Sequence, residues 1–495
     1  MVATILIGAI LCAAVSITYV LYQITYNLFF SPLRNVPGPL IARVTPRWLM
    51  LIDMAGRRTS WIHNLHSRHG PTVRIAPNEL SFANMEMVKV IYGQQTTFPK
   101  APIYDTMSLP PFGIFSMRDR QDHSHRRRLL SHAFAQSSLY ESEPLIRAHV
   151  EELTQRVQSG LCRPMDMMLL FRLVAFDIVG ELFLGQSFNG LKAGTPPQFL
   201  HDIDQHFILC GIEGNFPLIY AMLLRIPIPA LQRFLKARQR LIAYGKETFE
   251  NYISENGRMS GRKDLLTKVV SLKSDTGEAP LTDLEIYTEV SNLILAGTDT
   301  TSMTLTYMFW QLAKNPKWQQ MLRQEVGEKV PTSSGTVPGF SELAQLPILD
   351  AVVKEALRLH PAAPASLPRE TPQGGKILNG SHIPEGTIVS MQCYTTQRDA
   401  ATFPDPNAFR PERWMAPESE AMKEMMMPFS KGSRACLGKN LAMMELKLIT
   451  ASLINKFSVW LGPNCTDESM VMTDHFLVLP KGGKCEMIFS RVEES

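Results

Sequence analysis

The stretch PFSKGSRACLGKNLA, residues 428–442, carries a single cysteine, Cys436, in a glycine-rich turn. Apolar side chains recur every three or four positions after it, which predicts a helix from Gly438 to Phe457. Cys436 therefore precedes a helix N-terminus, where backbone N–H groups and the positive end of the helix dipole stabilise a thiolate. The pattern favours a cysteine that acts as a soft anionic ligand.

The residues around this cysteine suit a flat, negatively charged ligand. Gly432 permits a turn that a Cβ would hinder, and Gly438 lets the helix approach a flat group closely. Arg434 offers a fixed fork for a carboxylate, and Phe429 shields the sulfur from water. Haem meets these demands, with propionates for the arginine and iron for the sulfur of Cys436. The alternative is an ordinary buried cysteine in a loop.

Length and composition describe a folded protein. The chain has 495 residues, of which 45% are hydrophobic and 19% charged. A net charge of +4 is too small to indicate nucleic-acid binding. The seven cysteines contain no C-x-x-C pair, which argues against a disulfide framework and against a structural zinc site.

The N-terminus differs from the rest of the chain. Residues 1–30 contain no charged side chain, and a helix needs roughly 20 apolar residues to cross a bilayer. We interpret the segment as a transmembrane anchor, with a cleaved signal peptide as the alternative. The first basic residues, Arg34, Arg43 and Arg47, predict a single-pass topology with a cytosolic body. Residues 31–40, SPLRNVPGPL, are proline-rich and predict a stiff hinge.

Residues 41–495 are expected to form one domain, mainly α-helical with small β-sheets, because no second linker, internal repeat or low-complexity tract follows the hinge. Helical periodicity is clearest at Glu143–Gln158, Ala230–Glu255, Asp283–Lys314, Phe340–His360 and Gly438–Phe457. Strands are predicted at residues 72–77, 387–394 and 475–480. The segment from Thr387 to Trp414 becomes irregular after its strand.

The segment PFSKGSRACLG resembles the cysteine-loop signature of the cytochrome P-450 superfamily, the haem-thiolate monooxygenases, at every defining position. Three other segments of this chain, KEALRLHP, LILAGTDTTSMT and DHSHRRRLLSHAF, follow the motifs of that family in order and spacing. The resemblance covers nearly the whole chain. It implies the cytochrome P-450 fold, haem b as iron protoporphyrin IX, and Cys436 as the axial metal ligand.

The segment KEALRLHP, residues 354–361, places Glu355 and Arg358 on one face of a helix. Taken alone, such a pair is a solvated surface bridge. In the family, this pair joins the arginine of an irregular segment, here Arg413, in a buried ion cluster that locks the cysteine loop. The resemblance therefore implies that the three side chains are buried together.

The segment LILAGTDTTSMT, residues 293–304, combines Gly297 with several threonines inside a long helix. Glycine costs about 1 kcal/mol relative to alanine in a helix interior, and threonine hydroxyls compete for backbone carbonyls. We therefore expect a locally opened turn, with Ala296 at its edge. Asp299 and Thr300 beside it match the residues that deliver protons during oxygen activation in the family. The alternative is an exposed polar turn of a core helix.

The segment DHSHRRRLLSHAF, residues 122–134, places His123 and Arg127 four positions apart on one helix face. They align with a W-x-x-x-R element that holds a haem propionate in the family, with histidine in place of tryptophan. Arg369 in SLPRE matches a further propionate contact. The alternative for this helix is a basic solvated face, which Arg126 and Arg128 are expected to form.

The resemblance implies that one atom of O2 is inserted into a C–H bond or a double bond of the substrate. Only 59 residues follow Cys436 (495 minus 436), too few for a fused flavin domain. We therefore expect electrons from NADPH through a separate membrane-bound flavoprotein reductase. Its expected docking charges are Lys431, Lys439, Arg126 and Arg128.

The segments that line the distal pocket in relatives are poor in charge here, which favours an apolar small-molecule substrate of natural-product size. The candidate pocket residues are Phe112, Phe115, Phe207, Ala296 and Phe476, and each aromatic ring among them is equally compatible with a plain core position. The combination of hinge and helix motif resembles fungal microsomal members that oxidise secondary metabolites.

Three other functions are compatible with the same residues. A haem-thiolate isomerase or dehydratase would not activate external O2, and it has less use for the pair Asp299 and Thr300. A membrane-anchored haem carrier or sensor would bind haem without turnover. A haem-free membrane scaffold would use Cys436 structurally.

Overall fold

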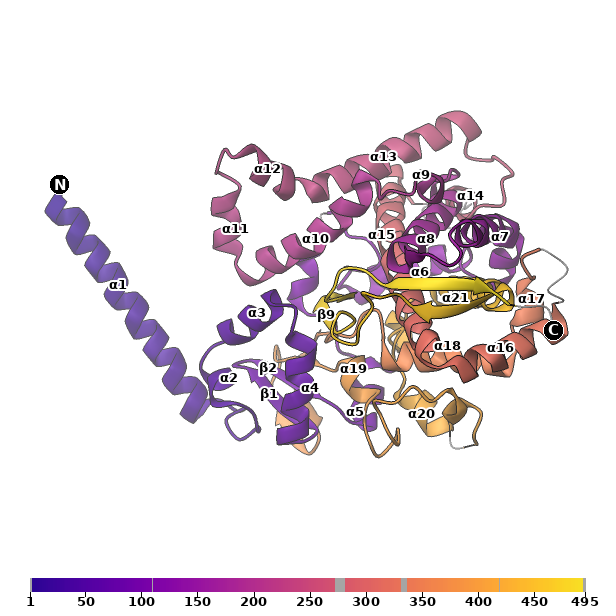
Figure 1. Ribbon diagram of the computed structural model, residues 1–495. Coiled ribbons are helices and arrows are strands. Elements are labelled where there is room, and N and C mark those ends of the chain that lie inside the picture. The colour runs from indigo at the N-terminus through magenta and orange to yellow at the C-terminus, as the bar shows by residue number, and fades with distance from the viewer. Residues whose placement is uncertain (1, 109, 272–280, 331–335, 418, 493–495) are drawn as a thin grey trace.

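The computed structural model describes residues 2–108, 110–271, 281–330, 336–417 and 419–492. Figure 1 shows a globular body from which one long N-terminal helix projects. The α-helices in chain order are α1 (Val2–Thr25), α2 (Leu40–Val44), α3 (Arg47–Met54), α4 (Arg58–His69), α5 (Met85–Tyr92), α6 (Arg120–Ser131), α7 (Gln136–Ser159), α8 (Met167–Leu184), α9 (Gly190–Ala193), α10 (Gln198–Asn215), α11 (Pro217–Leu223), α12 (Pro229–Leu235), α13 (Ala237–Asn256), α14 (Leu265–Val270), α15 (Asp283–Lys314), α16 (Pro316–Lys329), α17 (Phe340–Leu343), α18 (Pro347–Leu359), α19 (Cys393–Thr396), α20 (Ser419–Met425) and α21 (Lys439–Lys456).

Short 3-10 or π turns and small sheets complete the body. The turns are η1 (Tyr26–Phe30), η2 (Pro102–Thr106), η4 (Pro411–Trp414) and η5 (Gly432–Arg434). The strands are β1 (Thr72–Ala76), β2 (Glu79–Phe82), β3 (Pro164–Asp166), β4 (Arg369–Glu370), β5 (Lys376–Leu378), β6 (Ser381–Ile383), β7 (Ile388–Ser390), β8 (Phe457–Leu461), β9 (Met472–His475), β10 (Leu477–Pro480) and β11 (Glu486–Arg491). The architecture is therefore mainly helical with small sheets, as predicted.

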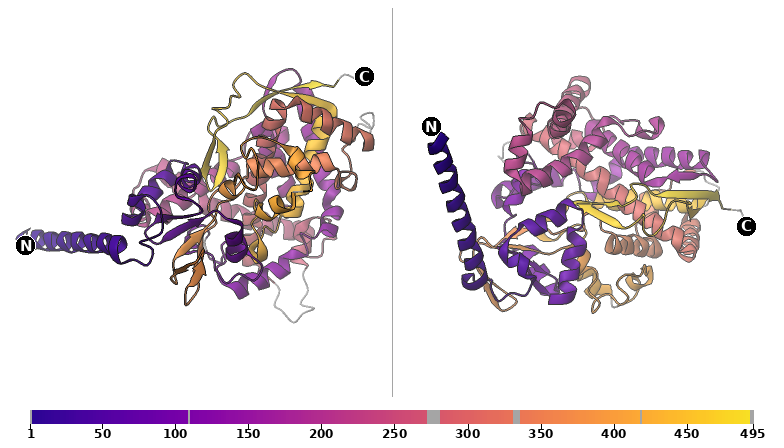
Figure 2. Two further views of the ribbon diagram at one scale, coloured as in Figure 1. Left: turned by 90° about the horizontal axis from the view of Figure 1, so that it is seen from below. Right: turned by 60° about the vertical axis from the view of Figure 1, so that its left-hand side comes forward.

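The strands form four separate sheets. The largest has the order β1-β2-β7-β4, in which β2 and β7 run parallel and the other pairs run antiparallel. A three-stranded antiparallel sheet has the order β3-β11-β8, and β5-β6 and β9-β10 are hairpins. Figure 2 shows α1 projecting from one side of the body, while the yellow C-terminal strands reach the opposite side among the helices.

The core is centred on α15, which runs through the middle of the body and packs along α8. A Cβ on Gly297 would lie 2.6 Å from a methyl carbon of Val179 in α8, so only glycine allows this close approach. Almost every side chain of α8 is buried, which explains the continuous apolar pattern of that segment. The two helices form the scaffold on which the remaining elements are arranged.

The predicted helices differ from the observed ones mainly because the structure divides two of them into shorter helices. The predicted helix 340–360 is two helices, α17 and α18, because Pro347 lacks an N–H group and begins a new helix. The predicted helix 230–255 is divided at Lys236 into α12 and α13. The helix 283–314 has the predicted bounds. Of the strand predicted at 387–394, only Ile388–Ser390 form a strand, β7, because the short helix α19 begins at Cys393.

The proline-rich segment 31–40 is attached to the body. Arg74 of β1 is fully buried and donates hydrogen bonds to the carbonyl oxygens of Asn27 and Leu33, at 3.2 and 3.3 Å. The N–H group of Arg74 also donates to the carbonyl of Pro37 at 2.7 Å. A Cβ on Gly38 would lie 2.4 Å from the Arg74 carbonyl oxygen, so this contact requires glycine. These bonds hold the end of α1 against the sheet.

Candidate active site

Cys436 lies between η5 and the N-terminus of α21, on the predicted loop. Its N–H group donates to the carbonyl of Phe429 at 2.8 Å, which closes the loop. Gly432 has a φ of +64°, and a Cβ there would lie 2.3 Å from the carbonyl oxygen of Tyr92. The backbone of this turn therefore accepts only glycine.

Opposing effects act on the pKa of the Cys436 thiol. The residue is solvent-accessible, yet protein encloses the sulfur closely enough that burial raises the pKa of its thiol. Hydrogen bonds from the backbone of Gly438 and Lys439 and the charge of Arg127 lower the same pKa. Because the net shift is upward, these donors alone do not hold a thiolate here, and a metal cation would supply the missing positive charge.

Basic side chains from four segments converge beside the cysteine loop. Burial and then the charges of Arg434, Lys100, Arg127 and Arg369 lower the pKa of His123 to about 3. Burial, followed by Arg369 and Arg434, lowers the pKa of Lys100 well below its usual value. Burial and the charge of Arg369 likewise lower the pKa of Arg434 to about 10. Burial is the largest cause of each of these three shifts, and neighbouring positive charges add to it.

This cluster of Lys100, His123, Arg127, Arg369 and Arg434, here called the basic cluster, fits a dianion. Among the described residues, none of the five forms a salt bridge with a carboxylate. Arg369 is 2% exposed, and its Nε has no hydrogen-bond partner within the described chain. Gathering such groups without an anion is costly, because like charges in a poorly solvated site raise each other's energy. The two propionates of haem would supply the negative charge that the basic cluster lacks.

Space for a flat group adjoins the cysteine. A Cβ built on Gly438 would have Phe134 as its nearest neighbour, with the ring carbon 4.0 Å away. Arg127 donates to the carbonyl of Ala435 at 2.7 Å, so the basic cluster is bonded directly to the cysteine loop. Arg434 donates through both Nη atoms to the carbonyls of Met117 and its neighbours in the loop before α6. The residues present therefore fit haem.

Glu355, Arg358 and Arg413 form one buried ion cluster. Arg358 donates to both carboxylate oxygens of Glu355, at 2.8 and 2.9 Å, and both side chains are fully buried. Arg413 of η4 donates to Glu355 at 3.1 Å, and the indole N–H of Trp414 donates to it at 2.9 Å. The carboxylate of Glu355 thus receives donors from two segments that are distant in sequence.

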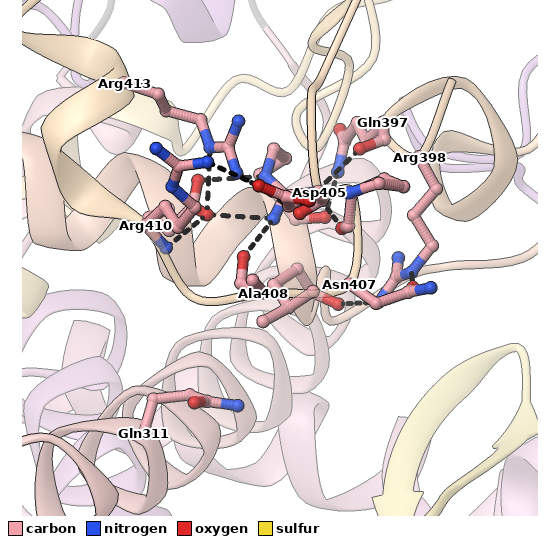
Figure 3. Close-up of polar contacts among 12 residues, drawn as sticks. Gln311, Gln397, Arg398, Asp405, Asn407, Ala408, Arg410 and Arg413 are labelled. Carbon is pink, nitrogen blue, oxygen red and sulfur yellow. Dashed lines mark hydrogen bonds and ion pairs between the residues drawn. The ribbon is translucent and has the colours of Figure 1, made fainter. Parts of the chain in front are cut away.

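The ion cluster reaches the cysteine loop through Gln397. Arg358 donates to the carbonyl of Gln397 at 2.9 Å, and the side chain of Gln397 accepts from the N–H of Met427 at 3.1 Å. Met427 directly precedes the loop of Cys436. Figure 3 shows Arg413 and Gln397 on opposite sides of the segment that contains Asp405 and Ala408. The cluster therefore joins α18, the segment after α19 and the start of the cysteine loop.

The expected opening of the helix at Gly297 is wrong, because α15 is continuous from Asp283 to Lys314. The hydroxyl of Thr298 donates to the carbonyl of Ile294, and that of Thr300 to Ala296, both at 2.7 Å. These bonds add to the helical pattern without displacing it. Gly297 serves the contact with α8 instead of an open turn.

Asp299 is buried and bonded to Arg172 of α8. The Nε of Arg172 lies 2.8 Å from one carboxylate oxygen of Asp299, and its Nη2 lies 3.2 Å from the other. Arg172 also pairs with Asp204 of α10 at 2.7 Å. Burial raises the pKa of Asp299, whereas the charge of Arg172 lowers it. Arg172 therefore holds both carboxylate oxygens of Asp299.

Glu445 of α21 is a buried acid that lies beside Thr301 of α15. Burial raises the pKa of Glu445 to about 8, and a hydrogen bond with Thr301 opposes the shift. One of its carboxylate oxygens has no hydrogen-bond partner among the described residues. Glu445 therefore keeps its proton at neutral pH, beside the hydroxyl of Thr301.

We expect Glu445→Gln to change how stability depends on pH. The folded pKa lies above the ordinary value of 4.5, so between about pH 4.5 and 8 the folded chain keeps a proton that the unfolded chain releases. The unfolding free energy of the natural protein should therefore fall by a few kcal/mol across that window, and the neutral glutamine should remove this loss. Urea titrations at pH 5 and pH 8 measure it, with exposed Glu328→Gln as the control. Equal pH dependence of natural protein and variant would contradict it.

Three of the predicted pocket aromatics meet. The rings of Phe115 and Phe476 lie 5.7 Å apart, and those of Phe207 and Phe476 lie 5.6 Å apart. Tyr104 of η2 extends the group, with its ring 5.7 Å from Phe115. Phe112 is half-buried and, within the described residues, makes no ring contact with the group. The group joins α10, the β9-β10 hairpin and the loop before α6.

Ala296 is exposed although it lies in the middle of α15, the central helix of the core. Its carbonyl accepts the hydroxyl of Thr300 at 2.7 Å. Because Ala296 is solvent-accessible in the middle of a core helix, this side of α15 faces a space within the body. Thr300, whose hydroxyl is bonded to Ala296, borders the same space.

The assignment of Arg126 as a solvated docking charge is wrong. Its side chain is 5% exposed and pairs with Glu289 at 2.9 Å and with Glu285, both on α15. Lys439 and Arg128 are exposed, and Lys431 is half-buried with its ammonium donating to the carbonyl of Glu424. Burial in an ion pair excludes Arg126 from a docking surface.

Three residues of the site were not among the predicted ones. Lys100 lies in an irregular segment without periodicity, so nothing in the sequence distinguished it. Glu445 lies on a predicted helix face, where a carboxyl group is ordinary. Arg172 did carry a signal, since a lone arginine within the apolar segment MMLLFRLVAF needs a buried partner.

Comparisons with known proteins agree with this geometry. The family model described as Cytochrome P450 matches residues 39–487. The protein named cytochrome P450 monooxygenase tazI of Aspergillus terreus is 33% identical over 472 residues, which cover 93% of this chain and 94% of the relative. Cytochrome P450 monooxygenase aflV of Aspergillus parasiticus is 32% identical over 478 residues, which cover 94% of this chain and 92% of the relative. The chain therefore belongs to the cytochrome P450 family of haem-dependent monooxygenases, which take electrons from a reductase partner.

Proposed function

We propose that the protein is a membrane-anchored monooxygenase that uses haem b and NADPH-derived electrons to hydroxylate or epoxidise an apolar, natural-product-like substrate in secondary-metabolite biosynthesis. The observation that supports the proposal is the basic cluster beside the loop of Cys436, which has no carboxylate ion-pair partner among the described residues and in which the Nε of buried Arg369 has no hydrogen-bond partner. When bound, haem supplies the chemistry that divides O2, one atom going to the substrate and the other to water.

The residues of the chain hold and orient the cofactor. Cys436 would provide the thiolate that binds the haem iron, and Phe429 and Gly438 would complete the wall of its loop. Arg127, His123, Arg369, Arg434 and Lys100 hold the propionates. His123 would donate to a propionate through a ring N–H.

Protons are managed by Asp299 and Thr300. The carboxylate of Asp299 is bonded to Arg172, so it takes up and releases a proton when that ion pair opens. The hydroxyl of Thr300 donates to the carbonyl of Ala296 and can turn toward the space that Ala296 faces. Together they would bring protons to the side of α15 where the substrate lies.

The substrate is proposed to lie against the aromatic group of Phe115, Phe207 and Phe476, with Ala296 and Phe112 nearby. These side chains carry no charge and give an apolar surface, which favours a hydrocarbon-rich ligand. Lys100 lies beside this group, with its ammonium 4.3 Å from the ring centre of Tyr104. The cofactor and substrate sites would therefore adjoin at η2.

The reductase is proposed to approach the cysteine side of the body. Lys439 lies at the exposed N-terminus of α21, and Arg128 lies on the exposed face of α6. Positive charge at such a surface attracts an acidic partner and accelerates its association. Lys431 contributes its half-buried charge at the same loop.

The bilayer is proposed to be the endoplasmic reticulum membrane, which α1 would cross once with the body in the cytosol. The apolar helical segment Leu6–Phe30 has a mean hydropathy of 1.9, and none of its most apolar window is buried in the body. The segment around α11 supports further contact with lipid, since Leu218 is 81% and Met222 is 67% exposed. Apolar residues so exposed are typical of a surface that meets another apolar phase.

Reconstitution tests the proposal directly. The full chain, a flavoprotein reductase and NADPH are combined in phospholipid vesicles with a panel of apolar natural products, and products are analysed by mass spectrometry under 18O2. We expect a product that gains one 18O atom in an NADPH-dependent manner. Product that forms without O2 would indicate an isomerase or dehydratase, and haem binding without any turnover would indicate a carrier.

We expect Thr300→Ala to uncouple electron use from product formation. Without the hydroxyl, protons should be delivered less selectively on this side of α15, so that more reducing equivalents leave as hydrogen peroxide. The ratio of peroxide to product should rise about tenfold or more, in line with the loss of a positioned acid-base group. Thr304→Ala, which removes a buried hydroxyl one turn further along α15, is the control. An unchanged ratio would exclude Thr300 from proton delivery.

A further inference from the structure

Positive charge is concentrated in the segment that follows α1. Residues 31–70 contain six arginines and one acid, Asp53, so their net charge is +5, against +4 for the whole chain. The six are Arg34, Arg43, Arg47, Arg57, Arg58 and Arg68. The remainder of the protein is therefore almost neutral, and its excess charge belongs to one short region.

Two of these arginines line a small surface groove on α4. The groove has a volume of about 150 Å³ and is lined by Arg57, Ser60, Trp61, Asn64, Leu65 and Arg68. Their spacing of three and four positions places them along one face of the helix. No carboxylate lines the groove, whereas guanidinium, hydroxyl and amide groups do. We call it the α4 groove.

The two arginines of the α4 groove lack a partner within the part of the chain that the structure describes. Among the described residues, the guanidinium groups of Arg57 and Arg68 form no ion pair or hydrogen bond. Arg58, next to Arg57 in sequence, points elsewhere and pairs with Glu79 at 2.7 Å. Glu79 is therefore paired with Arg58, whereas Arg57 and Arg68 of the groove have no ion-pair partner among the described residues.

The groove lies on the side of the body from which α1 leaves. Figure 1 places α2, α3 and α4 there, and α2 is in contact with α1. Exposed apolar side chains accompany them, since Leu40 is 68% and Leu51 is 64% exposed. Trp61 at the groove packs edge to face on Trp48, with ring centres 6.2 Å apart. Tryptophan beside arginine is typical of the boundary between lipid and water.

We propose that the α4 groove binds the phosphate of an anionic phospholipid in the cytosolic leaflet, an inference that rests on the membrane anchoring proposed above. Guanidinium groups match phosphate oxygens in paired hydrogen bonds, and Ser60 and Asn64 add neutral donors. A groove of this size is smaller than the roughly 300 Å³ of drug-sized ligand pockets, and it suits a single headgroup phosphate.

The contact would fix how the body stands on the membrane. The hydrogen bonds of Arg74 already hold the end of α1 against β1, so the body cannot turn freely about residues 31–40. A lipid held at α4 provides a second point of attachment. The two points fix the line between them. Contact of the exposed apolar residues of α2 and α3 with lipid would then set the tilt of the body about that line.

The experiment compares lipids that remain with the full chain after reconstitution. Natural protein and the double variant Arg57→Gln, Arg68→Gln are placed in nanodiscs of phosphatidylcholine and phosphatidylinositol, extracted mildly, and their retained lipids quantified by mass spectrometry. We expect phosphatidylinositol to be enriched on the natural protein. The double variant should lose about tenfold or more of that enrichment, because each arginine near an anionic surface strengthens binding about fivefold.

Matched variants separate the groove from general charge. The double variant Arg163→Gln, Arg491→Gln removes two exposed arginines at β3 and β11, and it should retain the natural enrichment. Arg57→Lys with Arg68→Lys keeps the charge, and should keep part of the enrichment. Equal losses in the control and groove variants would overturn the proposal, because the effect would then depend on net charge alone.

Three further outcomes would overturn it. If inorganic phosphate or glycerophosphate displaced the retained lipid at equal concentration, the groove would be a site for soluble phosphate. If the natural protein stayed in carbonate-washed membranes but showed no enrichment, the groove proposal would be wrong and the anchoring would stand. Release of the chain by carbonate would instead remove both proposals.

Discussion

Cys436→Ser is expected to abolish haem-thiolate character and turnover together. A serine hydroxyl has a far higher pKa than a thiol and donates little charge to a metal, so it cannot replace the axial thiolate. The reduced, carbon monoxide-bound protein should lose the strongly red-shifted Soret band, and product formation should fall by at least a hundredfold. Absorption spectra and NADPH-dependent turnover measure the two effects on the same preparation.

The control for this variant is Cys162→Ser, which changes an exposed cysteine at the end of α7. It should keep both the spectrum and the activity of the natural protein. A Cys436→Ser protein that retained its pigment, its red-shifted band and full turnover would contradict the assignment of the axial ligand. Loss of pigment in both serine variants would instead point to a general effect on folding.

Arg358→Ala is expected to prevent formation of the haem site. The arginine is fully buried and bonds Glu355 and the carbonyls of Gln397, Pro406 and Ala408. Removing it leaves Glu355 with less positive charge and orphans three carbonyl groups, and breaking a buried pair costs about 3–5 kcal/mol. Since a domain has only about 5–15 kcal/mol of stability, the haem-to-protein ratio should fall close to zero. Haem content and resistance to limited proteolysis measure this.

Arg410→Ala is the matched control for the ion cluster. Arg410 lies three positions from Arg413, but it is 40% exposed and pairs with Asp405 and Glu412 at the surface. Exposed pairs contribute about 1 kcal/mol or less, so this variant should bind haem normally. Arg358→Lys should behave like Arg358→Ala, because an ammonium cannot bridge both oxygens of Glu355 and the distant carbonyls. Normal haem content in Arg358→Ala would show that the cluster is dispensable.

The local pattern of the sequence predicted the fold class, the apolar N-terminal helix and the cysteine loop. These features depend on neighbours in the chain: periodicity predicts α15 and α21, and a turn with a φ of +64° accepts only glycine at residue 432. The resemblance also identified Glu355, Arg358 and Arg413, although their spacing alone suggested a surface pair. Such features can be recognised without knowing what lies across the core.

Contacts between distant segments required the folded structure. Lys100 joins the basic cluster, Asp299 pairs with Arg172, and Arg126 is buried against α15, because the charge around each group comes from elements far away in sequence. The continuity of α15 at Gly297 has the same origin, since close packing on Val179 outweighs the weak helix propensity of glycine and threonine. Burial and electrostatic partners are properties of the assembled core, which periodicity along one segment does not encode.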